Sequence, residues 1–183
     1  MNFKKIILYK EPAVSEINIE KLTKFLEDNF PFEVKIKENI FKEFSLKNIK
    51  ELSNTRITDI KNSFSKYDSN DTEIKFEEKL CRNSSVMDST TKVENAQEIS
   101  QVFMYDGFEL QKILRYLNED DQTIHVILTN RLTCTFDEND KRYHARAVSC
   151  TNPSIIASTG RVEAAAKPKE YYFEVMKLRT QGL

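Results

Sequence analysis

The order of apolar patterns at the start of the chain constrains the fold most strongly. The short apolar run within Phe3–Tyr9 is typical of a buried strand. After Pro12, apolar residues recur at helical spacing from Ile19 to Phe30, which predicts an amphipathic helix of about three turns. Phe32–Lys37 then alternates apolar and charged side chains, as a half-buried strand does. A strand, a helix and a strand in this order predict an α/β unit.

Further elements follow from caps and apolar spacing. Ser45 precedes the helical pattern Leu46, Ile49 and Leu52, and Asp106 with Glu109 forms a cap before a second apolar stripe. The remaining predicted elements are a strand buried on both faces at Ile124–Thr129, a short strand within Ser154–Arg161 that leaves the sheet through a glycine turn, and a final helix from Pro168 to about Leu178 with Tyr172, Val175 and Met176 on its buried side.

The middle of the chain carries an excess of acidic side chains and few apolar ones. Asp68–Asp71 and the Ser/Thr-rich run Asn83–Thr91 lack the residues to anchor a continuous element. We predict one α/β domain spanning residues 1–183, with a polar, mobile insertion at about residues 67–100 that holds one short helix, Glu73–Cys81.

Composition excludes several functions and selects none. No apolar run approaches the ~20 residues that cross a bilayer, and we expect a cytoplasmic protein. The formal net charge of -1 makes nucleic acid an unfavoured partner. Three glycines are too few for a glycine-rich phosphate loop, two histidines cannot form a three-histidine metal site, and three cysteines do not make a disulfide framework.

A hairpin provides the candidate metal ligands. Leu132–Phe136 and Tyr143–Cys150 flank the polar tip Asp137–Lys141, and a hairpin centred on Asn139 places Cys134 opposite His144. Cross-strand Cβ atoms lie roughly 5 Å apart, so this pair can share a zinc ion or act as a Cys–His dyad. The alternative is a small buried thiol beside a partly exposed imidazole.

Other candidates are weaker. The acidic tip Asp137–Asp140 fails the calcium-loop pattern, because Arg142 stands at its glycine position. His125 lies within an apolar strand and is interpreted as a hydrogen-bonded core residue. If the strands pair as predicted, a positive patch forms from Arg131, Arg142, Arg146 and Arg161. The candidate binding residues are Arg131, Arg142, Arg146 and Asn152.

Several longer sequence blocks carry a family resemblance. They are Ile7–Pro12, Tyr105–Gln111, His125–Asp140, Arg142–Val148, and the stretch that begins with Asn152–Ile156 and ends with Lys167–Glu174. They resemble an uncharacterised archaeal family of proposed metallopeptidases, which is distantly similar to archaemetzincins. Archaemetzincins are zinc proteases with a twisted sheet followed by a metal-binding His-Glu-x-x-His helix. The resemblance implies a mixed twisted sheet with packed helices, in the manner of a metzincin N-terminal subdomain. It also implies an edge strand that accepts an extended peptide, with Ala145–Thr151 as the candidate.

The sequence contains no His-Glu-x-x-His motif, which we expect downstream of the helix beginning at Pro168. We expect no catalytic residue and no cofactor in the chain as given, and zinc only if a C-terminal segment is missing. A fragment, a natural short form and a mistaken family description remain open. The leading hypothesis is the substrate-side portion of a metallopeptidase with a peptide or protein partner. The alternatives are a non-catalytic interaction module and a Cys–His enzyme; the oligomeric state remains open.

Overall fold

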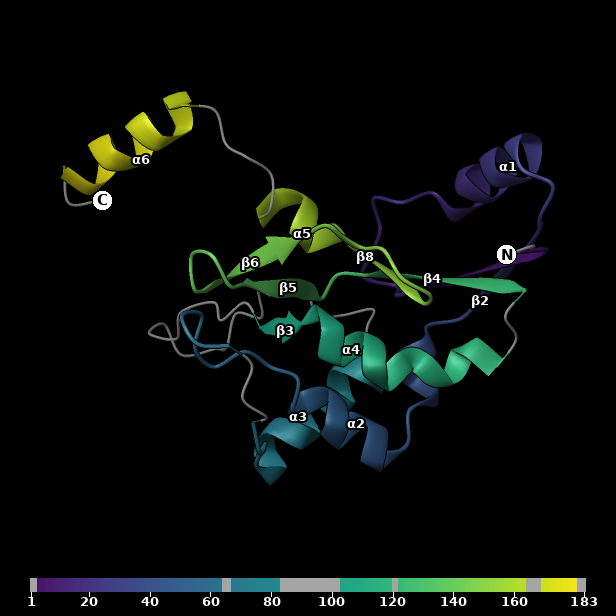
Figure 1. Ribbon diagram of the computed structural model, residues 1–183, viewed down its shortest axis with the longest axis horizontal. Coiled ribbons are helices and arrows are strands. Elements are labelled where there is room, and N and C mark those ends of the chain that lie inside the picture. The colour runs from purple at the N-terminus through teal and green to yellow at the C-terminus, as the bar shows by residue number, and fades with distance from the viewer. Residues whose placement is uncertain (1–2, 64–66, 83–102, 120–121, 164–168, 181–183) are drawn as a thin grey trace.

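A five-stranded sheet forms the centre of the molecule (Figure 1). The computed structural model describes residues 3–63, 67–82, 103–119, 122–163 and 169–180. The strands of this sheet are, in spatial order, β2 (Glu33–Lys37), β1 (Lys5–Lys10), β4 (Thr123–Thr129), β8 (Ser154–Ala157) and β7 (Val148–Ser149).

The first four of these strands run parallel, and β7 at the edge is antiparallel to β8. Helix α1 (Ile19–Asn29) connects β1 to its parallel neighbour β2, which confirms the predicted α/β unit. The strand predicted at Ile124–Thr129 is also confirmed, since β4 lies between β1 and β8. Strand β2 is an outer strand, so Ile36 is 49% exposed and the prediction of a half-buried strand is wrong at that position.

The main core lies between the five-stranded sheet and a layer of helices. This layer contains η1 (Ile40–Glu43), α2 (Leu46–Ser53), α3 (Asp71–Arg82), α4 (Gly107–Leu114) and η2 (Arg115–Glu119). Ile127 and Ile155 of the sheet are buried in one cluster with Leu52 and Leu110 of the helices. The caps predicted at Ser45 and Asp106 are confirmed, because Ser45 accepts from the Asn48 amide and Asp106 accepts from the amides of Phe108 and Glu109. The predicted return bond from Glu109 is wrong, because its carboxylate pairs with Lys112 and the Asp106 amide donates to the Thr55 carbonyl.

Helix α3 belongs to this layer. The sequence predicts only a short helix, Glu73–Cys81, inside an insertion, whereas the observed helix is longer and buries Glu77 and Cys81 completely. Its first turn is capped through Asn70, which accepts from the amides of Thr72 and Glu73. Residues 83–100 of the predicted insertion lie outside the described residues.

A second, three-stranded sheet has the order β3 (Met104–Asp106), β5 (Leu132–Asp137) and β6 (Arg142–Arg146). Its own small core contains Leu132, Cys134 and Tyr143. Strands β5 and β6 form the predicted hairpin, and β6 leads directly into β7. The hairpin therefore connects the two sheets.

Helices α1 and α5 (Ser158–Glu163) lie on the other side of the sheets from α2, α3 and α4 (Figure 1). Helix α5 follows β8 directly and contains Gly160, so the predicted glycine turn is wrong. Helix α6 (Lys169–Thr180) stands apart from the sheets, and Met176 is 62% exposed rather than buried as predicted. The side chains of Tyr172 and Val175 lie outside the description. Within the described ranges, no helix is long and apolar enough to cross a membrane.

Candidate functional site

Strand β7 presents main-chain groups at the edge of the larger sheet. The Ala157 amide donates to the Ala147 carbonyl at 2.9 Å, and Val148 pairs with Ile156 in the same antiparallel register. Hydrogen-bonded and non-hydrogen-bonded pairs alternate in such a ladder. The amide and carbonyl of Val148 therefore face away from β8, and its side chain is 46% exposed. This edge lies within Ala145–Thr151, the candidate peptide-binding strand that the family resemblance implies.

The neighbouring edge strand β6 is covered. The Tyr143 amide donates to the Ile60 carbonyl at 2.8 Å, so the outer edge of β6 already has a main-chain partner there. At the end of β6, Gly160 of α5 lies so close that a Cβ atom built on it would be 2.1 Å from the Arg146 oxygen. Between β6 and β7, it is β7 whose outer edge has no main-chain hydrogen bond to another segment within the described ranges.

A hollow of about 330 Å³ lies beside the end of β7. One of its walls is formed by α4 and the first residue of η2, whose lining residues are spaced at i, i+3, i+4 and i+7, and the other is the connection from β7 to β8. The lining residues are Phe108, Gln111, Lys112, Arg115, Thr151 and Asn152. The sequence analysis does not predict the lining residues of the α4 wall as binding residues. The signal for them is their helical spacing outside the apolar stripe of the same helix.

The hollow is aromatic at one end and cationic at the other. Phe108 is 56% exposed, although it is a large apolar side chain. Lys112 forms an ion pair with Glu109, whereas exposed Arg115 forms no ion pair within the part of the chain that the structure describes. The hollow therefore offers an apolar surface and, as far as the described residues go, a positive charge on Arg115 without an ion-pair partner.

Asn152 holds the connection that forms the second wall. Its amide nitrogen donates to the Thr123 carbonyl at 2.8 Å, and its oxygen accepts from the His125 amide at 2.9 Å. Both contacts tie the start of β8 to β4. His125 itself is buried, and its Nδ1 lies 3.1 Å from the Tyr9 hydroxyl, which confirms its interpretation as a core residue. Among the predicted binding residues, Asn152 is the one that lines the hollow.

The predicted pairing of Cys134 with His144 is wrong by one residue. Cys134 lies opposite Ala145, and His144 lies opposite Thr135. Adjacent residues of a strand point to opposite faces, so the thiol and the imidazole are on different sides of the hairpin. The hairpin loop has four residues rather than five, because Asp137 already pairs with Arg142. Lys141, the last residue of this loop, adopts a left-handed backbone conformation with φ 55°.

This register separates both candidates from the predicted chemistry. Cys134 is buried, and burial together with nearby Asp106 raises its thiol pKa to about 12, so the thiol is not activated as a nucleophile. His144 makes a hydrogen bond with Asp140, with 2.7 Å between Nε2 and Oδ2. The structure therefore contains no Cys134–His144 dyad and no shared metal position for them.

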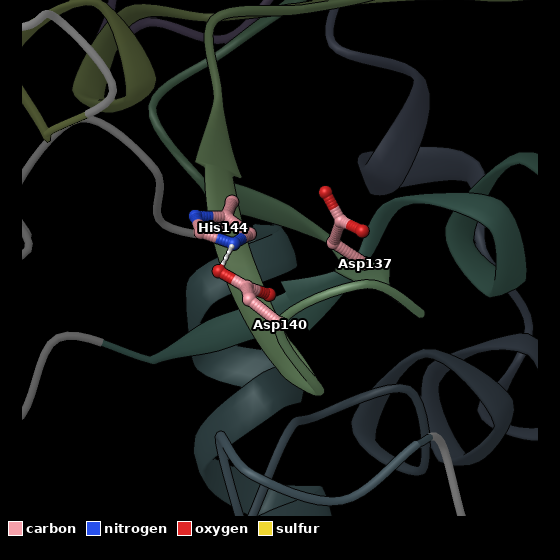
Figure 2. A group of neighbouring side chains, drawn as sticks. All are labelled: Asp137, Asp140 and His144. Atoms are coloured by element: carbon pink, nitrogen blue, oxygen red, sulfur yellow. Dashed lines mark hydrogen bonds and ion pairs between the residues drawn. The ribbon is translucent and has the colours of Figure 1, made fainter.

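His144 instead joins a group at the tip of the hairpin. Asp137, Asp140 and His144 place one ligand atom each within 4.8 Å of one another (Figure 2). Asp137 also closes the turn, since its Oδ1 accepts from the backbone and side-chain nitrogens of Asn139. Those bonds lower the pKa of Asp137. The side chains of Asp140 and His144 are 45% and 37% exposed, so this group faces solvent.

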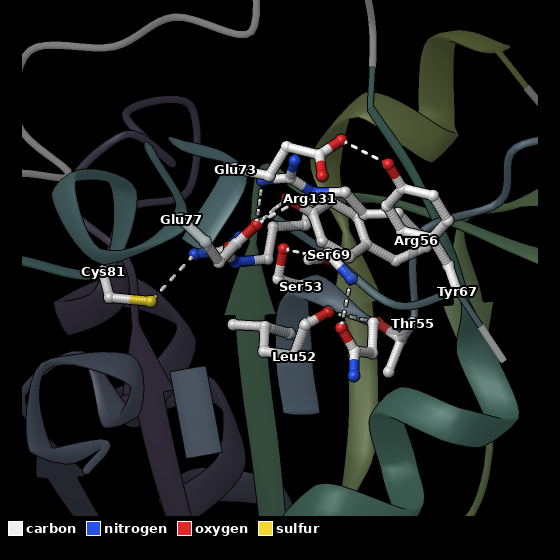
Figure 3. Close-up of polar contacts among 12 residues, drawn as sticks. Leu52, Ser53, Thr55, Arg56, Tyr67, Ser69, Glu73, Glu77, Cys81 and Arg131 are labelled. Atoms are coloured by element: carbon white, nitrogen blue, oxygen red, sulfur yellow. Dashed lines mark hydrogen bonds and ion pairs between the residues drawn. The ribbon is translucent and has the colours of Figure 1, made fainter. Parts of the chain in front are cut away.

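Arg131 does not join the predicted positive patch. It is buried in a network of polar side chains, where it donates to Glu77, to the Tyr105 hydroxyl at 3.0 Å and to the Cys81 sulfur at 3.6 Å (Figure 3). The other predicted members, Arg142, Arg146 and Arg161, are exposed. The predicted patch is therefore wrong for Arg131.

Glu77 is the centre of this buried network. Arg56 donates to it at 2.5 and 3.2 Å, and the Tyr105 hydroxyl donates to it at 3.0 Å. Burial alone would raise the pKa of Glu77, but attraction to Arg131 and Arg56 outweighs burial and lowers it. The network joins α3, β3 and the loop between β4 and β5, and its role is structural.

Comparison with known proteins identifies a family. Residues 2–182 match the family described as "Probable metallopeptidase family (DUF6775)". The chain belongs to this family. No curated protein and no solved structure matches the chain. The match covers the blocks on which the sequence resemblance to proposed metallopeptidases is based.

The described residues do not fit the catalytic zinc ion that the archaemetzincin resemblance implies. A catalytic zinc is held by three protein ligands, and a ligating imidazole normally donates its second nitrogen to a partner. Asp137, Asp140 and His144 are the group of three donors in the described ranges. They lie at the partly exposed tip of the hairpin, and His144 has no second hydrogen-bond partner among the described residues. We derive no catalytic step from this group.

Proposed function

We propose that the chain is the substrate-side portion of an archaemetzincin-like metallopeptidase and binds an extended peptide along β7. The amide and carbonyl of Val148 carry the proposal, because they face away from β8 and have no main-chain partner among the described residues, and an added strand pairs with such groups at a sheet edge. The family supports the peptidase class.

Catalysis is not assigned to the described residues. The donor group at the hairpin tip lacks the properties of a peptidase zinc site, so we propose that the chain as given binds peptide without hydrolysing it. We also place the protein in the cytoplasm, because its three cysteines are free thiols, as expected in a reducing compartment. A protein-interaction module remains the alternative if the bound segment belongs to a stable partner rather than to a substrate.

The experiment removes the edge amide. V148P eliminates this amide while Ala147 and Ser149 keep their places in the ladder, and proline is tolerated on edge strands. V148A is the matched control, because it removes most of the same side chain and keeps the amide. The ¹⁵N-labelled proteins are titrated with an equimolar library of N-acetylated, C-amidated hexapeptides, and chemical shifts are followed at Ser149 and Ile155.

We expect saturable shifts at these amides in the wild type and V148A and none in V148P. Urea unfolding checks that V148P is folded, and if it is not, the shift of the Val148 amide in the wild type gives the same information. Binding of the library to V148P with unchanged affinity contradicts the proposal. Mass spectrometry of the same mixtures tests catalysis, since cleavage abolished by 1,10-phenanthroline would show that the chain is itself a peptidase.

A further inference from the structure

We propose that the hollow between α4 and the β7–β8 connection binds a carboxylate of the peptide that pairs with β7. This inference rests on the proposed function and specifies its substrate class, namely peptides with a carboxylate near the Val148 pairing position. The hollow lies beside the proposed peptide-binding strand β7 and is lined by two cationic side chains and an exposed aromatic ring.

The register directs the peptide side chains toward the hollow. Ser149 faces α4, because a Cβ atom built on Gly107 would lie 3.3 Å from the Ser149 hydroxyl oxygen. Val148 faces the opposite side, since neighbouring residues of a strand alternate. A peptide residue paired with Val148 shares its face, so the residues on either side of it point toward the α4 layer.

The hollow begins where β7 ends. Thr151 and Asn152, which form one wall, follow Ser149 after a single residue. On the opposite wall, Gln111 donates to the Ser149 carbonyl at 3.2 Å and to the Pro153 carbonyl at 3.4 Å, which fixes α4 against the connection. A peptide side chain that passes the end of β7 on the α4 side therefore enters the hollow.

Charge then selects the side chain. Lys112 and Arg115 lie one helical turn apart on the same wall, and Glu109 compensates only Lys112. The planar Arg115 guanidinium has no ion-pair partner in the described part of the chain, and it matches a carboxylate through two parallel hydrogen bonds. The Phe108 ring, 56% exposed, adds an apolar surface for the stem of that side chain.

The experiment uses defined peptide mixtures with the full chain. Three libraries of N-acetylated hexapeptides are compared: one C-amidated with Asp fixed at the fourth position, one C-amidated with Lys fixed there, and one with a free C-terminal carboxylate and no fixed residue. Binding is followed at the Ser149 amide, and contact with the hollow at the Arg115 side-chain Nε–H and the Thr151 amide. The variant is K112Q/R115Q, and K24Q on exposed α1 is the matched control.

We expect a carboxylate-bearing library to bind the wild type about fivefold more tightly than the Lys library, the upper range for one exposed ion pair. K112Q/R115Q should lose this difference, and K24Q should keep it. Preference for the Asp library identifies a side-chain carboxylate, and preference for the free-acid library identifies a peptide C-terminus.

Two results overturn the inference in distinguishable ways. If all three libraries shift Ser149 with equal affinity, the hollow does not select carboxylates and the proposed peptide binding at β7 stands. If K112Q/R115Q still prefers a carboxylate-bearing library over the Lys library, the hollow again does not select carboxylates and the proposed peptide binding at β7 stands. If no library perturbs Ser149 or Arg115 in the wild type, the proposed function fails and the inference fails with it.

Discussion

Glu77 shows how a single residue can determine the structure of a region without taking part in a site. Its side chain is fully buried, and two arginines and one tyrosine hydroxyl satisfy its oxygens. A buried carboxylate without such partners would be strongly unfavourable. The same contacts explain why Arg131 is unavailable to a ligand. Burial and hydrogen bonding make this network a structural centre rather than a binding surface.

The substitution E77Q tests this role. Glutamine keeps the shape but removes the charge, which leaves Arg131 and Arg56 buried with Glu11 as the remaining nearby carboxylate, 3.4 Å from Arg131. Breaking a buried ion pair on one side costs about 3–5 kcal/mol. We expect urea unfolding at pH 7 to show a loss of that size. The control E78Q changes a partly exposed neighbour on α3 and should cost under about 1 kcal/mol. Equal effects of the two substitutions would contradict the assignment.

The same residue predicts a pH dependence. The pKa of Glu77 is lower in the folded protein than its ordinary value, so the folded state disfavours its protonation. Its contribution to stability is complete above the unfolded pKa of about 4.3 and is lost as pH falls through the lower folded pKa. The difference in unfolding free energy between wild type and E77Q should therefore shrink below about pH 4. A difference that stays constant from pH 7 to pH 3 would contradict this mechanism.

Local residue chemistry was predictable where it depends on neighbours in sequence. Asp106 caps α4 as its position before Phe108 and Glu109 indicates, because the amides that it accepts from are two and three residues away. Glu77 gave no such signal. Its partners Arg56 and Arg131 lie 21 and 54 residues away, and only the folded chain brings them together.

At the scale of elements, the hairpin shows that a sequence pattern can predict two strands without predicting their pairing register. Both strands were predicted, yet the register depended on whether the tip has four or five residues. Lys141 in a left-handed conformation decides this, and such a conformation is uncommon for lysine. A shift of one residue reverses the face of every side chain on one strand. The predicted strands were therefore correct, while the candidate site built on them was not.

Helix α5 depends on a close contact with β6, and G160A tests it. Alanine normally stabilises a helix interior by about 1 kcal/mol relative to glycine. Here its Cβ would lie 2.1 Å from the Arg146 oxygen and 2.7 Å from the Arg146 carbonyl carbon, and this backbone has to move. We expect G160A to lower the unfolding free energy by about 1–3 kcal/mol in urea titrations. G107A, with nearest contacts of 3.3 Å, is the comparison and should cost less. A stabilised G160A would show that α5 packs differently.

At the scale of the whole molecule, two sheets with separate cores divide the chain into regions of different character. The five-stranded sheet and its helical layer contain the larger core, and the small sheet holds the exposed hairpin tip. The five-stranded sheet ends in the antiparallel strand β7, which follows β6 of the smaller sheet in the sequence. The proposed peptide edge therefore lies at the junction of the sheets, and the donor group Asp137, Asp140 and His144 lies at the far end of the hairpin from β7.

This separation predicts the metal content of the protein. The side chains of Asp140 and His144 at the tip are 45% and 37% exposed, and His144 Nε2 is already engaged by Asp140 Oδ2 at 2.7 Å. We expect protein purified without chelator to contain well under one zinc per chain by inductively coupled plasma mass spectrometry. H144A should leave that value unchanged, as should the neighbouring control R142A. One zinc per chain in the wild type, lost in H144A and retained in R142A, would place a metal centre at the hairpin tip. That result would contradict the proposal that peptide binding at β7 and metal chemistry are separate in this chain.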